Sequence, residues 1–280
     1  MPTDLDLCLS IAREAAALVR QHAGTAVRLT KNANAEAVTA VDRASQRLIV
    51  SRLRAFHPND GIVGEESDDG LGITCQTPDP LGRVWVIDPI DGTNNFVAGF
   101  GAYAICIGLL EAGTPTVGVV YDVTRDCAYA GAVGQGAWLI AGDVRTPIHA
   151  RPEPMGPSAL IMMTSNLLDP AGELPQWAVR WLTIKPWKAR MIGSAALEAV
   201  QVAAGTALGA VTVNGKLWDV VAAAAVVLAA GGTLTKLDGT PLFPFDLCGY
   251  AGAKTPFLAA GPAAHGELLI EIREYHMAVK

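Results

Sequence analysis

The start of the chain carries two apolar patterns with the spacing of α-helices. Thr3 and Asp6 resemble a helix N-cap pair, and apolar residues then recur at helical spacing over 7–18. A second helix is predicted over residues 42–54, where the apolar positions again fall on one side. The segment 28–40 between them is polar and has no period, so a strand-and-loop segment is expected there.

From residue 84 the pattern changes to short apolar runs separated by turn residues, which predicts strands. The first of these runs ends at Asp88. The predicted strands are 84–87, 103–110, 116–121, 127–130 and 136–140. The first half of the chain is therefore expected to combine a helix pair with a mainly antiparallel sheet.

Residues 151–157 contain three prolines and mark the best internal boundary. Beyond them, strands are predicted over 160–164, 233–237 and 253–260, and helices over 194–204, 220–230 and 264–275. Strands that alternate with helices predict an α/β second half. We therefore expect two units, residues 1–150 and residues 151–280.

The composition narrows the class of protein. The chain has 280 residues, of which 51% are hydrophobic and 17% charged, so it is globular and large enough for one large domain or two modest ones. Its net charge is −6 and it has no basic tract, which argues against a nucleic-acid partner. The five cysteines are scattered, so neither a disulfide framework nor a zinc site is indicated.

Membrane association and export are not expected either. The N-terminus shows no basic segment followed by an apolar one, as a secretion signal would. The longest apolar run, residues 220–230, is too short to span a bilayer. A soluble, cytoplasmic protein is therefore predicted.

Three short segments contain the most informative polar residues. They are Gly64-Glu65-Glu66-Ser67, residues 85–96, and Leu217-Trp218-Asp219. In the middle segment an apolar run ends at Asp88, Pro89 restrains it to extended geometry, and Asp91 follows across a tight bend. Gly92 lets the backbone turn, and a helix that starts near Gly92-Thr93 would offer free N–H groups to an anion.

Two carboxylates beside an anion site indicate a bound cation. Carboxylates alone repel phosphate, whereas carboxylates bridged by Mg²⁺ attract it, and Mg²⁺ prefers hard oxygen ligands. Two such ions about 3.5–4 Å apart can stabilise the attacking and leaving oxygens of an in-line displacement. Each motif has a plainer alternative: Asp91 with Gly92 as a turn, Asp219 as a helix cap, and Asp68 with Asp69 as a solvated loop. Their joint occurrence favours the metal site.

The motifs resemble those of the inositol monophosphatase family of magnesium-dependent, lithium-sensitive phosphatases. The matching motifs are Gly64-Glu65-Glu66, Asp88-Pro-Ile-Asp-Gly-Thr93 and Trp218-Asp219, and the resemblance extends from about Leu7 to Ala260. It implies an α/β (α+β) fold, a layered αβαβα sandwich, usually assembled as a homodimer. Most metal ligands would then lie in the first unit, and Asp219 and the loops that set specificity in the second.

The resemblance also implies two or three Mg²⁺ ions. Glu65, Asp88 and the carbonyl of Ile90 would hold the first ion. Asp88, Asp91 and Asp219 would hold the second, and Glu65 with waters a third, weaker one. A water activated by these ions would attack phosphorus in line, without a covalent phosphoenzyme.

Further roles implied by the resemblance concern the phosphate and the attacking water. The backbone N–H groups of Gly92 and Thr93 would bind phosphate, and Thr93 paired with Asp42 would orient the water. The expected catalytic residues are therefore Thr93, Asp42, Glu65 and Asp91.

The remaining implied contacts concern the substrate alcohol and a mobile loop. Arg190, Gly193, Ser194 and Ala195 match a segment that contacts the substrate alcohol in the family, with ordinary helix capping by Ser194 as the alternative. Lys31 matches a lysine on the family's mobile metal-binding loop, with a plain surface lysine as the alternative.

Two positions depart from the family pattern. Thr212 stands where many inositol-specific members have a glutamate, and Glu36 stands where the family usually has an aspartate. The expected activity is Mg²⁺-dependent hydrolysis of a small phosphate monoester, such as an inositol-1-phosphate-like polyol or a sugar phosphate. Histidinol phosphate and 3′-phosphoadenosine 5′-phosphate are alternative substrates within the family. A non-catalytic regulatory binding protein on the same fold is the alternative from another class.

Overall fold

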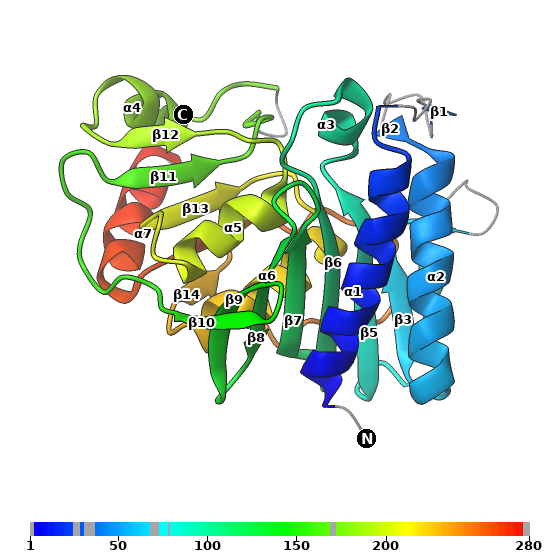
Figure 1. Cartoon of the computed structure of the whole chain (residues 1–280). Helices are drawn as coiled ribbons and strands as arrows, with labels where there is room; N and C mark the ends of the chain where they lie inside the picture. Colours follow the sequence, from blue (N-terminus) through cyan, green and yellow to red (C-terminus); the bar gives the residue numbers. More distant parts are fainter. Residues whose placement is uncertain are drawn as a thin grey trace.

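Five layers alternate through the computed structural model in the order helix, sheet, helix, sheet, helix (Figure 1). The structure describes residues 3–24, 29–30, 37–67, 73–77, 79–168 and 172–276. This arrangement confirms the expected αβαβα sandwich of the α/β class. Every helix among the described residues is too short or too polar to serve as a membrane span.

The first layer is the predicted helix pair, α1 (Asp4–Gln21) and α2 (Ala40–Phe56). Each helix begins after a threonine whose hydroxyl accepts a backbone N–H: Thr3 accepts from Asp6 at 3.2 Å, and Thr39 shares a capping box with Asp42. The apolar faces of both helices pack on one face of the large sheet. The caps thus fix where the helices start, and Asp42 lies in the first turn of α2.

The second layer is an eight-stranded sheet in the order β10-β9-β8-β7-β6-β5-β3-β4. All neighbours are antiparallel except β3 and β5. The strands are β3 (Gly61–Gly64), β4 (Thr74–Gln76), β5 (Arg83–Asp91), β6 (Ala104–Glu111), β7 (Thr114–Asp122), β8 (Cys127–Ala132), β9 (Gly136–Ala141) and β10 (Val144–Ile148). A separate two-stranded pair, β1 (Leu29–Thr30) with β2 (Ala37–Val38), precedes α2.

The middle layer consists of α5 (Ala195–Ala203) and the alanine-rich α6 (Leu217–Ala229). Helix α6 packs on the second face of the large sheet, where β6, β7 and β8 present glycines to it. A Cβ atom at Gly108 would lie 2.7 Å from the backbone nitrogen of Ala222, and one at Gly131 would lie 2.8 Å from Cα of Val226. Small residues on both sides therefore let the helix backbone approach the strands closely.

The fourth and fifth layers come from the second half of the chain. The smaller sheet has the order β12-β11-β13-β15-β14, and α4 (Gln176–Thr183) and α7 (Pro262–His276) form the outer layer (Figure 1). Its strands are β11 (Leu160–Met163), β12 (Lys188–Arg190), β13 (Gly209–Thr212), β14 (Thr233–Thr235) and β15 (Phe257–Ala260). Strand β11 runs parallel to both of its neighbours, so the sheet is mixed.

The structure differs from the sequence prediction in several places. The strand predicted to stop at Asp88 continues to Asp91, as part of β5. The pattern also missed β3, β4, β10, β12, β13 and α4, which are short or lack a clear apolar period. Residues 151–157 form neither helix nor strand, and the division of the chain into two units at this segment stays a prediction.

Candidate metal centre and active site

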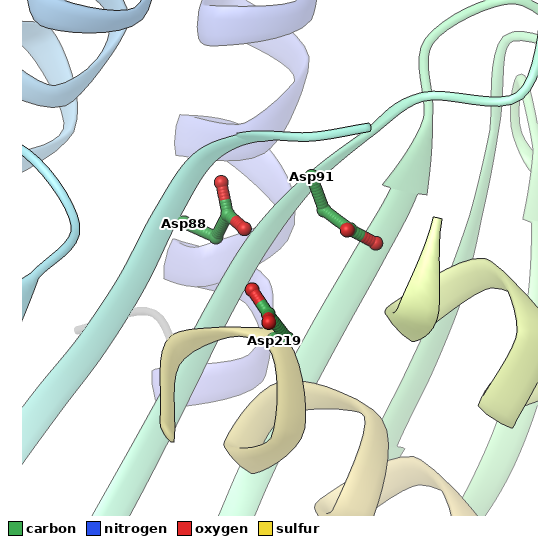
Figure 2. Close-up of side chains that lie close together, drawn as sticks. All are labelled: Asp88, Asp91 and Asp219. Atoms are coloured by element: carbon green, nitrogen blue, oxygen red, sulfur yellow. The ribbon is translucent and has the colours of Figure 1, made fainter. Parts of the chain in front are cut away.

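Three aspartates converge where the large sheet meets α6. Each of Asp88, Asp91 and Asp219 offers a carboxylate oxygen, and these oxygens lie within 4.8 Å of one another. Figure 2 shows the two side chains from β5 and the one from α6 pointing toward a common space. Residues more than 120 positions apart in the sequence thus form one acidic cluster.

An irregularity in β5 explains how Asp88 and Asp91 reach the same space. Side chains three positions apart in a regular strand point to opposite faces. The register against β6 shifts between Asp88 and Asp91, and Asp88 accepts a hydrogen bond from the N–H of Ile90 at 2.9 Å. Pro89 lies inside this irregular stretch, where its missing N–H removes no ladder bond. The bend therefore turns both carboxylates toward α6.

Asp219 has two roles at once. It is the third residue of α6, and its Oδ2 accepts a hydrogen bond from the backbone N–H of Lys216 at 2.7 Å. This is the helix-capping contact that the sequence left open as an alternative to metal binding. The same carboxylate belongs to the acidic cluster, so capping fixes its position and does not exclude metal binding.

Burial, together with the neighbouring negative charges, raises the pKa values of Asp88 and Asp91. Burial raises the pKa of Asp88 well above its usual value, and the charges of Glu65, Asp219 and Asp91 add to this effect. Burial and the charge of Asp219 raise the pKa of Asp91 to about 7, against the opposing effect of its hydrogen bonds from Ser194, Ala196 and Ala195. The cluster is thus held in a repulsive arrangement that a cation would relieve.

The Asp91 carboxylate accepts hydrogen bonds from residues at the N-terminus of α5. The hydroxyl of Ser194 donates to Oδ2 at 2.5 Å, and the N–H of Ala196 donates to the same oxygen at 2.8 Å. The N–H of Ala195 donates to Oδ1 at 3.3 Å. Because helix N-termini attract negative charge, these contacts favour the ionised form of Asp91 and fix its orientation.

A cavity of about 230 Å³ opens beside the aspartates. Besides the three clustered aspartates, its lining includes Glu65, Ile90, Gly92, Thr93, Gly193, Ser194, Ala195 and Glu198. Glu65 is not one of the three residues whose oxygens meet within 4.8 Å, but it lies in the same cavity. The structure therefore brings most of the site residues expected from the sequence to one place.

Thr93, which lines the cavity, is hydrogen-bonded to Asp42, which lies behind it and is not among the lining residues that the structure describes. The hydroxyl of Thr93 lies 3.1 Å from Oδ1 of Asp42 and 2.9 Å from the carbonyl oxygen of Ile90. Asp42 is buried, which raises its pKa, while hydrogen bonds from Thr39 and Thr93 act in the opposite direction. A threonine hydroxyl next to a buried carboxylate can orient a water or pass on its proton.

The backbone at Gly92 fits its place between two segments. Gly92 has φ = 92° and precedes α3 (Thr93–Ala98). A Cβ atom here would lie 3.0 Å from the carbonyl oxygen of Ala102 and 3.2 Å from that of Gly193. Only glycine suits this left-handed conformation in so little space, and it leaves the adjacent backbone open to a ligand.

Other residues singled out from the sequence lie elsewhere. Arg190 does not line the cavity beside the aspartates; it lines a second cavity of about 280 Å³, together with Arg125. Thr212 is buried on β13 and is not among the lining residues that the structure describes. The predictions for Lys31, Glu36 and the acidic pair Asp68 and Asp69 lie outside the described residues.

Several lining residues carry no sequence signal of their own. Thr164 and Ser165 directly follow β11, and Asn214 lies just after β13, the strand that pairs with β11 in parallel. The carboxyl ends of parallel strands meet at one edge of a sheet, which is a common position for ligand sites. Knowledge of this pairing would have indicated these residues, but the sequence pattern missed β13.

The oxygen-rich cluster fits a hard divalent cation. Its ligand atoms are carboxylate oxygens, which suit Mg²⁺, Mn²⁺ or Ca²⁺ better than soft metals. Asp88, Asp91 and Asp219 could hold such an ion, with Glu65 and the Ile90 carbonyl at the same cavity. Because burial makes several adjacent negative charges costly, a cation is the chemically consistent partner.

Comparisons with known proteins found relatives that match most of the chain. A family model described as the inositol monophosphatase family matches residues 5–278. Inositol-1-monophosphatase of Bacillus subtilis is 32% identical over 231 residues, which cover 82% of this chain and 83% of that protein. Histidinol-phosphatase of Mycobacterium tuberculosis is 34% identical over 244 residues, which cover 84% of this chain and 88% of that protein. The solved structure of a Thermotoga maritima IMPase is similar with a TM-score of 0.80 at 27% identity, over 97% of each chain.

Proposed function

We propose that this chain, which belongs to the inositol monophosphatase family, cleaves small polyol or sugar phosphates with the help of Mg²⁺. Membership of this family makes the chain a phosphoric monoester hydrolase. The observation that carries this proposal is the convergence of Asp88, Asp91 and Asp219 within 4.8 Å. Three carboxylates so close together are costly without a cation and attract a phosphate ester once a cation is bound. We expect two or three ions, with Glu65 and the Ile90 carbonyl as further ligands.

Mg²⁺ at this site would act as a Lewis acid on phosphate oxygens and lower the pKa of a water. The protein's own groups would do the rest. The Thr93 hydroxyl, 3.1 Å from Asp42, would orient the attacking water and relay its proton to that carboxylate. The N–H groups of Gly92 and Thr93 at the start of α3 would bind phosphate oxygens. Attack would be in line, and no side chain would form a covalent intermediate.

The side of the cavity at the start of α5 would bind the alcohol part of the ester. Ser194 and Ala195 lie there, and Gly193 precedes them with φ = 80°. Thr212 in place of an acidic residue argues for a substrate range beyond inositol phosphates. We propose a polyol or sugar phosphate such as myo-inositol 1-phosphate as the preferred substrate.

Histidinol phosphate is the second candidate substrate. A histidinol-phosphatase is among the relatives, at 34% identity over most of both chains. We also keep 3′-phosphoadenosine 5′-phosphate as an alternative. Homodimer assembly, inhibition by Li⁺ and a cytoplasmic location are further proposals that follow from the family resemblance.

The test is phosphate release from a panel of monoesters by EDTA-dialysed protein, with and without Mg²⁺ and Li⁺. We expect release only with Mg²⁺, inhibition by Li⁺, and the highest kcat/KM for a polyol phosphate. A clear preference for histidinol phosphate or for the nucleotide 3′-phosphate would overturn the polyol assignment. Binding of Mg²⁺ without hydrolysis of any ester would support the regulatory alternative instead.

A further inference from the structure

The turn of residues 192–194, which leads to the groups that bind Asp91, is hydrogen-bonded by the side chains of Glu198 and Asn95. Residues 192–194 lead into α5, and their geometry decides where the Ser194 hydroxyl and the first N–H groups of the helix point. These groups are the hydrogen-bond donors that fix Asp91. Any residue that fixes this turn therefore acts on Asp91 without touching it.

Glu198 holds the turn from inside α5. Its Oε1 accepts hydrogen bonds from the N–H of Ile192 at 2.8 Å and from the N–H of Gly193 at 3.1 Å. The residue is only 1% exposed, so water does not compete for these contacts. Burial raises the pKa of Glu198 to about 8, so at neutral pH its carboxyl is a largely neutral acceptor in this position.

Asn95 holds the same turn from α3. Its Nδ2 donates to the carbonyl oxygen of Ile192 at 2.7 Å and to that of Ala102 at 2.8 Å. Gly193 has φ = 80°, and a Cβ atom there would lie 3.0 Å from Asn95 Nδ2. The Ile192–Gly193 peptides are thus bonded on both their N–H and C=O sides, and little space remains for the turn to shift.

We propose that Glu198 and Asn95 are positioning residues that set the affinity of the cation bound by Asp91. They act by fixing the 192–194 turn, which in turn directs the Asp91 carboxylate toward Asp88 and Asp219. The inference rests on the proposed cation-dependent function. It deepens that function by adding two residues that act on Asp91 through the turn; neither is among the proposed ion ligands, although Glu198 also lines the cavity.

The proposal depends on an acceptor atom at residue 198 and not on a charge there. Glu198→Gln keeps an oxygen that can accept from Ile192 and Gly193, whereas Glu198→Ala removes it. Gln201→Ala is the matched control, because Gln201 lies one turn further along α5 and hydrogen-bonds Tyr129, away from the aspartates. Asn95→Ala removes the second contact independently.

The experiment measures Mg²⁺ binding to metal-free protein by isothermal titration calorimetry, alongside the Mg²⁺ dependence of turnover. We expect Glu198→Ala and Asn95→Ala to weaken Mg²⁺ binding about tenfold, which corresponds to about 1.4 kcal/mol. Turnover at saturating Mg²⁺ should fall much less than the affinity. Glu198→Gln and Gln201→Ala should stay within about twofold of the wild type, a scatter well below the tenfold effect.

Two results would overturn the proposal. One is an Mg²⁺ affinity equal to that of the wild type in the folded Glu198→Ala and Asn95→Ala variants. If Glu198→Ala does not fold, Asn95→Ala alone decides this point. The other is a Glu198→Gln variant as weak as Glu198→Ala, which would assign the effect to charge. Calorimetry needs no substrate, so a wild type that binds Mg²⁺ but hydrolyses no ester refutes the proposed function and leaves this test standing.

Discussion

Helix α6 has two contrasting environments along its length. Its body packs against the glycines of β6, β7 and β8, where the apolar contacts are close and no polar group is required. Its first turn places Asp219 against Asp88 and Asp91, where like charges meet in a buried space. The body of the helix stabilises the fold, whereas its N-terminal turn costs stability until a cation is bound. The body of α6 thus contributes to the stability of the fold, and its first turn contributes to the proposed cation site.

The largest expected effect comes from removing the charge of Asp91, which lies against the first turn of α6. Asp91→Asn keeps the shape of the side chain but removes one of the three clustered charges. We predict that turnover falls on the order of 10²-fold or more, because cation binding weakens and phosphate is no longer held. Near-normal turnover, measured by phosphate release at saturating Mg²⁺, would contradict the site assignment.

The second prediction separates proton transfer from cation binding in the cavity next to the first turn of α6. Thr93→Val keeps the size of the side chain and removes the hydroxyl that faces Asp42. We predict a fall in kcat of about 10²-fold, with Mg²⁺ affinity little changed. Thr124→Val is the control, because the Thr124 hydroxyl bonds Asp122 in a turn remote from the metal cavity. An unchanged kcat in Thr93→Val would remove Thr93 from the mechanism.

The third prediction concerns the body of α6. Gly118→Ala would place a Cβ against the carbonyl oxygen of Ala222, so the helix must shift away from the sheet. We predict a loss of about 3 kcal/mol in the free energy of unfolding, measured with urea. Gly156→Ala is the matched control, because its Cβ would meet nothing within 4 Å. Equal stability of the two variants would mean that the close approach of α6 contributes little.

The smallest effect is a pH dependence of stability that should appear only without cations. The pKa of Asp91 is about 7 in the folded protein and 3.8 as its ordinary value, and that of Asp88 is also raised. The folded state therefore binds more protons, so stability is highest below the ordinary value and is lost as pH rises toward 7. We predict that in EDTA the Tm falls by a few degrees between pH 5 and pH 8 from this cause. Asp91→Asn should reduce this fall in Tm. Mg²⁺ should raise the Tm of the wild type more at pH 8 than at pH 5, and equal increases in Tm at the two pH values would contradict this expectation.

Sequence alone was informative wherever a short motif carries its own geometry. The Asp88 to Thr93 segment indicated the bend, the start of α3 and two of the three clustered aspartates. The cap pair of Thr3 and Asp6 indicated the start of α1, whereas the Thr39 cap of α2 was missed and that helix starts two residues before its predicted start. The features that were predicted depend on residues close together in the chain, so local chemistry was enough to predict them.

Features that depend on distant pairing were not predictable. The cavity position of Thr164 and Asn214 follows from the pairing of β11 with β13, which no local pattern reveals. Glu198 resembled an ordinary polar position of a helix, although its carboxyl is buried against the turn before that helix. The extension of β5 to Asp91 was missed because the apolar run stops at Asp88, whereas the irregular stretch that contains Pro89 continues the strand.

The most direct test of the central claim is Mg²⁺-dependent phosphate release by the wild type and by Asp219→Asn, starting from EDTA-dialysed protein. Asp219 is distant in sequence from the other two aspartates and joins them only through the fold. We expect no release by the dialysed wild type, saturable recovery with Mg²⁺, and a large loss of that recovery in the variant. Full activity of the dialysed wild type, or wild-type recovery in Asp219→Asn, would contradict the central claim.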